Sequence, residues 1–371
     1  MKFESLKELV EHLINRQYFD VDDETVYDTI RKSLRIKENN VGWRYINGEK
    51  NNTGDVKLVG EDLNALREDI SNEFDAFIHK ARKQGYVGND RLEAINNLDN
   101  PIVAVQAFGD NTDEYGFLTF DNSIGIPNSE FEEAVGKNQV EAGIDKRQDS
   151  LLLGEFGQGS FASIGISSEG CKLIVSIHEN TPNLVSFTIT RQNEDGDFQY
   201  MTINGEIPSF NLEDTEGLEL GDTIDHTLTT GTLTKVFKVN RTKNRNSIRG
   251  DSFKRKFGYK YPDLAVPLRL YDSRSQYSDN DYDEWDGLLS EVTNLGKSKT
   301  FKKTMKDDDF GEIDFIAVVP EEGEEFSKKY ISAGDPRTFF TIDGMTHETE
   351  SEDITASKFG LDRIHTQCLL F

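Results

Sequence analysis

The sequence has very little cysteine and no long apolar run. Cys171 and Cys368 are its only cysteines, and they lack metal-ligand spacing, so a reducing, cytoplasmic location is expected. No apolar stretch approaches the roughly 20 residues that cross a bilayer. The first residues, Met-Lys-Phe-Glu-Ser-Leu, lack the apolar core of a signal peptide. We therefore expect no association with a membrane.

Positive charge is also scarce. The chain has 42 lysines and arginines against 68 aspartates and glutamates, a formal net charge of −26. A surface this acidic repels phosphate backbones, which argues against a protein that coats nucleic acid uniformly. Positive charge is unevenly distributed, with two basic runs at residues 235–260 and 297–306. Each run is either a solvated loop or a local dock for nucleic acid or an acidic partner.

The alternation of helical and strand patterns over 371 residues predicts an α+β protein with two domains. Apolar spacing predicts two helices within residues 1–36 and, after strands beginning near Val41, a long helix that Gly85 ends. Tight turns such as Asn204-Gly205 separate several of the strands. The clearest strands are expected at residues 102–108, 116–120, 172–177, 184–190, 200–203, 231–237, 313–319 and 338–342.

The long helix includes a polar stretch, Leu66–Ala76. Glu68, Asn72 and Asp75 stand at positions i, i+4 and i+7, so they share one helical face, while apolar residues between them allow the helix to pack. A carboxylate one turn from a carboxamide can hold a water molecule and a hard metal ion together. Taken alone, the pattern is more typical of a solvated helix face.

Two later stretches combine glycine with polar residues. Asp121-Asn-Ser-Ile-Gly125 follows a strand directly, so its carboxylate can accept a hydrogen bond from a flat ligand; an ordinary Asp-Asn turn is the alternative. Gly154-Glu-Phe-Gly157-Gln-Gly159-Ser160 precedes a helix-compatible segment and is suited to a phosphate nest, although a merely flexible loop has the same composition. Thr232, in the strand that begins at Gly231, has a hydroxyl free for a ligand.

In this order and at these distances, the motifs resemble those of the GHKL ATPases, which include gyrase B, the large heat-shock chaperone, histidine kinases and MutL. Glu68-x-x-x-Asn72-x-x-Asp75-Ala76 is similar to the first family motif, and Gly154-x-x-Gly157-x-Gly159-Ser160 to the glycine-rich lid. Asp121-Asn-Ser-Ile-Gly125 looks like the Asp-x-Gly-x-Gly motif, with Ser123 where the family usually has glycine. A positive φ at Ser123 would cost about 1 kcal/mol or more.

The resemblance implies a Bergerat fold over residues 41–240, a two-layer sandwich of a mixed β-sheet and helices. A helical extension would precede it over residues 1–40, and an α/β transducer domain, truncated at its C-terminus, would follow over residues 241–371. The transducer would extend a basic side chain to the γ-phosphate. The candidates for that role are Lys297, Lys299, Lys302 and Arg337.

ATP and Mg²⁺ are the ligands that the resemblance implies. Glu68 would be the general base that activates water, and Asn72 would hold the metal. The expected nucleotide-binding residues are Asp75, Ala76, Asp121, Gly125, Gly154, Gly157, Gln158, Gly159, Ser160 and Thr232.

The likeness is greatest to MutL-related and chaperone-related ATPases of prokaryotic anti-phage defence systems. ATP hydrolysis would then drive lid closure and dimerisation as a conformational switch, read by a defence effector protein. A nucleotide-gated sensor or scaffold with little or no hydrolysis is the alternative. The presence of Glu68 favours hydrolysis, whereas Ser123 and the acidic surface leave room for the sensor.

Overall fold

The structure of the protein is a computed structural model, and its described ranges leave gaps along the chain. It describes residues 5–16, 24–33, 41–46, 62–88, 90–111, 113–136, 159–213, 217–221, 224, 226–239, 246–277, 281–294, 298–307, 311–320, 338–342, 345–350 and 369–370.

The chain forms two compact units. The first contains Met1–Arg245 and Arg269–Asp283, and the second contains Asn246–Leu268 and Glu284–Phe371. Residues 269–283 therefore return to the first unit after the second has begun. A linear division of the chain at residue 240 does not anticipate this return.

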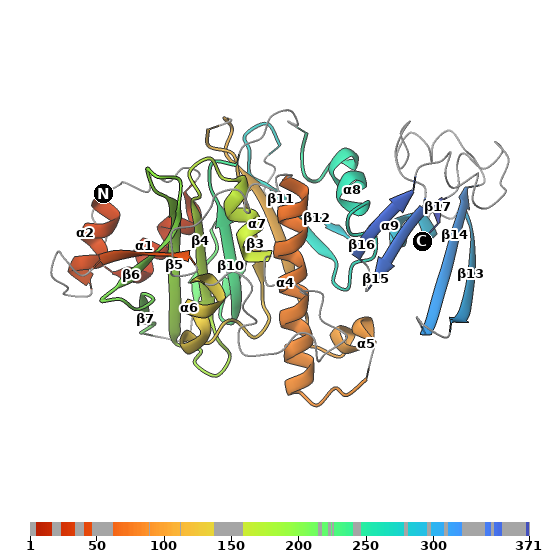
Figure 1. Ribbon diagram of the computed structural model, residues 1–371, viewed down its shortest axis with the longest axis horizontal. Helices are drawn as coiled ribbons and strands as arrows, with labels where there is room; N and C mark the ends of the chain where they lie inside the picture. The colour runs from red at the N-terminus through yellow and green to blue at the C-terminus, as the bar shows by residue number, and fades with distance from the viewer. Residues whose placement is uncertain are drawn as a thin grey trace. The chain divides into compact units, whose positions relative to one another are not determined.

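A large β-sheet forms the centre of the first unit, with the strand order β1-β6-β5-β4-β10-β3-β2-β11-β12 and β7 paired to β5 (Figure 1). Along this order, each pair of neighbouring strands from β1 to β2 is antiparallel, and β5 and β7 are also antiparallel. The strands are β1 (Val41–Tyr45), β2 (Val103–Phe108), β3 (Gly116–Asp121), β4 (Lys172–Ile177), β5 (Leu184–Gln192), β6 (Phe198–Ile203), β7 (Ser209–Asn211), β10 (Gly231–Val236), β11 (Leu268–Asp272) and β12 (Tyr282–Trp285). A separate pair consists of β8 (Leu218–Glu219) and β9 (Thr227–Leu228).

The long helix α4 (Asp62–Lys83) runs along one face of this sheet (Figure 1). Leu66, Ile70, Phe74 and Ile78 recur at helical spacing and are buried, so the hydrophobic effect holds α4 in place. Gly85, at φ 97°, takes the left-handed conformation just beyond the end of the helix, as predicted. Within the described residues of the first unit, α4 is followed by the helices α5 (Arg91–Asn96), α6 (Asn128–Gly136) and α7 (Gly159–Ile166).

Two more helices, α1 (Leu6–Asn15) and α2 (Glu24–Ser33), contribute to the core of the opposite face. Their buried apolar side chains form one cluster with Leu173, Val175 and Ile177 of β4. The alternate residues of that strand point the other way, because successive side chains of a strand leave opposite faces. The sheet therefore has helices on both faces, which the expected two-layer arrangement does not include.

Lys235 of β10 connects α1 to the sheet. Its buried ammonium donates to the backbone carbonyl oxygens of Leu13 at 3.5 Å, Ile14 at 2.5 Å, and Arg16. These carbonyls lie at the C-terminal end of α1, where the helix dipole favours a cation. Burial lowers the pKa of Lys235 well below its usual range.

The expectation of a basic surface over residues 235–260 is therefore wrong at its start. Lys235 is bonded to backbone carbonyls, and Lys238 is 8% exposed and pairs with Glu169. Neither ammonium group is available to a nucleic acid. Residues 240–245 of the same run lie outside the described residues.

The second unit contains a five-stranded sheet with the order β13-β14-β17-β15-β16. Its elements are α8 (Asp251–Gly258), α9 (Leu288–Thr293), β13 (Ser298–Asp307), β14 (Gly311–Pro320), β15 (Thr338–Ile342), β16 (Met345–Glu350) and β17 (Leu369–Leu370). β15 pairs with β17 in parallel, whereas β13 and β14 form a long antiparallel hairpin. Phe257 and Trp285 are buried together, with ring centroids 6.0 Å apart.

The α+β class is confirmed, and strands lie where the sequence predicts them. Asn204 and Gly205, both with positive φ, form the expected turn. Among the described residues, no helix is both long and apolar enough to span a membrane.

Candidate functional site

Helix α4 carries the polar residues of the first predicted motif. The side chain of Glu68 is 27% exposed, and its carboxylate pairs with Arg67 at 2.5 Å. Asn72, one turn further along, is half-buried. The helix therefore places a carboxylate and a carboxamide in register, with solvent access at Glu68. Their assignment to water activation and metal binding stays a prediction.

Asp75, the third member of the motif, is engaged within the protein. Its carboxylate lies 3.3 Å from the guanidinium of Arg91 on α5, and both side chains are almost completely buried. The same guanidinium lies over the ring of Phe74. Asp75 thus ties α5 to α4, while Ala76 beside it is half-buried.

The second motif meets Thr232 across two neighbouring strands. Asp121 ends β3 and is directly opposite Thr232 of β10 in the antiparallel register. The Thr232 hydroxyl lies 3.1 Å from the hydroxyl of Ser176 on β4. Three adjacent strands therefore bring one carboxyl and two hydroxyl groups together. Only the pairing of β10 with both β3 and β4 creates this arrangement.

Close backbone packing surrounds Asp121. Gly231 has φ 115°, and a Cβ there would lie 1.9 Å from the carbonyl oxygen of Asp121. Gly125 has φ 69°, and a Cβ there would lie 2.2 Å from the carbonyl oxygen of Ile177. Both positions require glycine, since any side chain would collide with backbone. Gly125 is therefore a packing residue in addition to its predicted role in binding.

Ser123 does not carry the expected strain. The non-glycine residues with positive φ within the described ranges are Asn100, Asn204 and Lys238, so Ser123 keeps an ordinary backbone conformation. Its N–H donates to Oδ1 of Asp121 at 2.8 Å, and its hydroxyl donates to the same atom. Serine is accommodated here without strain and fixes the orientation of the Asp121 carboxyl.

Burial raises the pKa of Asp121 to about 6. The hydrogen bonds from Ser123 and the positive charge of Lys80 act in the opposite direction and limit the increase. Lys80 is on α4, and its ammonium donates to the carbonyl oxygen of Asn122 at 3.0 Å. This contact places α4 directly over the end of β3.

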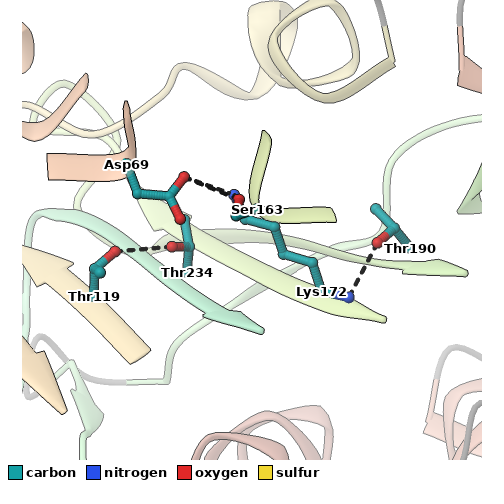
Figure 2. A network of polar contacts seen from close by, with 6 residues as sticks. All are labelled: Asp69, Thr119, Ser163, Lys172, Thr190 and Thr234. Atoms are coloured by element: carbon teal, nitrogen blue, oxygen red, sulfur yellow. Dashed lines mark hydrogen bonds and ion pairs between the residues drawn. The ribbon is translucent and has the colours of Figure 1, made fainter. Parts of the chain in front are cut away.

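Between α4 and the sheet lies a buried polar network that the sequence analysis missed. The ammonium of Lys172 is 3.0 Å from Oδ1 of Asp69 and 2.6 Å from Oγ of Ser163. Ser163 in turn donates to Asp69 at 3.1 Å. Figure 2 shows the Lys172 side chain reaching these groups while its backbone N–H donates to Thr190 at 3.0 Å. Helices α4 and α7 and strand β4 are thus joined by one buried cation.

Glu73 is a second buried acid on the same helix, one turn after Asp69. Burial raises the pKa of Glu73 well above its usual range, and the negative charge of Asp121 raises it further. Glu73 also bonds to Thr119, whose hydroxyl lies 2.9 Å from that of Thr234. Oε2 of Glu73 has no hydrogen-bond partner among the described residues.

A signal for these acids was present in the sequence. Asp69 and Glu73 stand one turn apart and beside the buried residues Ile70 and Phe74, so they belong to the packed side of the helix. Acids in that position are seldom buried unless they are paired or bonded.

The glycine-rich segment is described only where it enters α7. Gly154, Gly157 and Gln158 lie outside the described residues. Gly159 and Ser160 form the first turn of α7, whose later residue Ser163 belongs to the buried network. Helix α7 is thereby anchored to α4 at its middle, through the contact of Ser163 with Asp69.

Magnesium would have few protein ligands here. Within the described part of the chain, no group of three or more His, Cys, Asp or Glu side chains is arranged to hold a metal ion. Mg²⁺ at nucleotide sites commonly takes one or two protein oxygens and receives the rest from phosphate and water. The carboxamide of Asn72 fits that donor chemistry.

No protein-family model and no curated protein matches this chain.

The buried Lys172–Asp69 pair should make a large contribution to stability. Lys172→Met removes the cation and leaves Asp69 buried beside Glu73, so we expect the free energy of unfolding to fall by about 3–5 kcal/mol. The double variant Lys172→Met/Asp69→Leu removes both charges and should recover much of this loss. Chemical denaturation measures both changes. A loss below about 1 kcal/mol in the single variant would show that the pair is not buried in solution.

The raised pKa of Asp121 predicts a pH dependence of stability. The folded protein binds this proton more tightly than the unfolded chain, with a pKa of about 6 against the usual 3.8. The resulting stabilisation is present below about pH 4 and is lost as the pH rises towards about 6. Denaturation of wild-type protein and Asp121→Asn across this range should give a stability difference that declines with pH. A constant difference would contradict the buried carboxyl.

Proposed function

We propose that the first unit is a nucleotide-binding domain of GHKL type that binds ATP and hydrolyses it with Mg²⁺. The observation that carries the proposal is the pairing of Asp121 with Thr232 across β3 and β10, at glycines that keep the backbone close. Helix α4 lies over the same site, since Lys80 reaches the carbonyl of Asn122. The first, second and last motifs of the resemblance thus lie on neighbouring elements, α4, β3 and β10.

The nucleobase of the ATP would be recognised at Asp121. Its Oδ1 accepts from the N–H and the hydroxyl of Ser123, and the carboxyl group also accepts from the backbone N–H of Thr232. A carboxylate has about four acceptor positions, so it can still accept a hydrogen bond from an amino group of a ligand. Thr232 supplies a hydroxyl that donates or accepts beside it.

The phosphates would lie towards the glycine-rich segment. Backbone N–H groups in the first turn of α7, at Gly159 and Ser160, are donors with no partner within a regular helix. The Lys172–Asp69–Ser163 network holds α7 beside α4, the helix that carries Asn72 and Glu68. Mg²⁺ held by Asn72 would offset charge on the phosphate oxygens.

Glu68 is the residue that we assign to water activation. It is partly exposed, as a general base that meets a water molecule needs to be. Its pairing with Arg67 restrains the position of the carboxylate. Hydrolysis then requires Glu68 to leave Arg67 when nucleotide binds.

The Arg67–Glu68 pair also supports the second candidate function, a sensor that binds nucleotide and hydrolyses it slowly or not at all. In that case Glu68 stays with Arg67 and the bound nucleotide acts as a ligand that stabilises one conformation. Dimerisation, an effector partner and a role in anti-phage defence rest on the resemblance and stay predictions.

Glu68→Gln should lower ATP turnover by about 10²–10⁴-fold with little change in ATP affinity, because a general base acts on water and not on the nucleotide. Turnover by phosphate release and affinity by calorimetry measure the two quantities. The matched variant Arg67→Ala should raise turnover if the ion pair restrains the base. Equal, substantial turnover in wild type and Glu68→Gln would show that Glu68 is not the base, whereas ATP binding without turnover in the wild type would support the sensor.

Asp121→Asn should weaken ATP binding about 5- to 100-fold. A carboxamide held by Ser123 presents a donor to the amino group of the base, which leaves a buried group unpaired at about 1–3 kcal/mol. Calorimetry with ATP checks this, and Ser123→Gly, which keeps the carboxylate, serves as control. Unchanged ATP affinity in Asp121→Asn would show that the nucleobase does not bind at Asp121.

A further inference from the structure

The β13–β14 hairpin of the second unit has one face rich in apolar side chains. The antiparallel register pairs Phe301 with Ala317 and Lys303 with Phe315. Paired residues, and residues two apart on one strand, share a face of a hairpin. We name this the aromatic face; its members are Lys299, Phe301, Lys303, Met305, Ile313, Phe315, Ala317 and Val319, and the face ends at the pair Asp307 and Gly311 beside the turn.

The large side chains of the aromatic face are exposed to solvent. The exposed fractions are 59% for Phe301, 41% for Met305, 44% for Phe315 and 40% for Val319. Contiguous exposed apolar groups of this kind are rare on soluble proteins unless they bind a partner.

Charge on the hairpin differs between its two faces. On the aromatic face Lys299 and Lys303 stand beside the two phenylalanines, and Asp307 is the single acid, at the turn end of β13, so the face has a net positive charge. On the other face, Lys302 and Lys306 accompany Glu312 and Asp314, so the charges there balance. A positive, aromatic face on a chain with a net charge of −26 fits a partner that is anionic and has flat apolar groups.

We propose that the aromatic face binds single-stranded nucleic acid. Phe301 and Phe315 are diagonal neighbours across the two strands, about 7–8 Å apart at their backbone positions. Each ring offers a surface on which one base stacks, and the lysines beside the rings meet the phosphates.

Three other occupants fit less well. A duplex keeps its bases stacked inside and offers no free base to a phenylalanine ring. A second copy of the chain would bring the same lysines together, since a two-fold interface places one patch against itself. Anionic bilayers are typically bound by clusters of about four to eight lysines or arginines, whereas the aromatic face has two, Lys299 and Lys303.

The proposal is tested with the full chain and a fluorescein-labelled oligothymidylate of 12 nucleotides, by fluorescence anisotropy at low salt. Phe301→Ala and Phe315→Ala should each weaken binding about tenfold, while Phe301→Tyr, which keeps an aromatic ring, should bind like wild type. Lys303→Ala should also reduce the slope of log affinity against log salt concentration by about 0.7. A thermal melt of each variant confirms that it is folded.

Lys302→Ala is the matched control, because it removes the same charge one residue away on the opposite face. Its affinity should remain within about twofold of wild type, as expected for a residue that makes no phosphate contact. Equal effects of Lys302→Ala and Lys303→Ala would overturn the proposal, as would stronger binding to the matching 12-base-pair duplex. Binding to phosphatidylserine vesicles without binding to the oligonucleotide, or a change of mass that Phe301→Ala abolishes, would assign the face to a membrane or to a second copy.

Discussion

The buried pairing of Lys172 with Asp69 is the constraint on which the proposed nucleotide site depends. It is the point where α4, α7 and the sheet share one charge, and Ser163 completes its hydrogen bonding. A buried ion is tolerated only when its partners are fixed, so the two helices cannot shift independently without leaving a charge unpaired. The lysine also offsets part of the negative charge of Asp69 and Glu73.

Along the central strands of the sheet, side chains that make polar contacts alternate with side chains that pack in the apolar cluster. Along β10, Thr232 and Thr234 point towards α4, while Leu233 joins the apolar cluster that includes α1 and α2. Along β4, Lys172 and Ser176 make the polar contacts, and Leu173 and Val175 belong to that cluster. One face can therefore hold buried polar groups because the other supplies apolar burial.

Local patterns predicted the elements, and long-range contacts decided the environments of their side chains. The spacing from Leu66 to Ile78 was sufficient to predict α4, since amphipathic periodicity is a property of the segment itself. The pairing of Asp121 with Thr232 depends on β10 entering between β3 and β4, which no local pattern encodes. The same is true of Lys172, whose strand was predicted but whose partners come from two helices. Ser123 was expected to be strained, and its hydrogen bonds to Asp121 occur in an ordinary conformation instead.

The contacts of Lys235 make the N-terminal helix α1 part of the first unit. Its ammonium lies 4.3 Å from the ring centre of Phe108 and 5.0 Å from that of Phe237, and its hydrogen-bond acceptors are carbonyls at the end of α1. A fragment starting at residue 41 would lack those carbonyls and leave the amine facing aromatic rings. The same fragment would uncover the apolar side chains that α1 and α2 now shield. The N-terminal helices are therefore an integral part of the domain and not an appendage that can be trimmed.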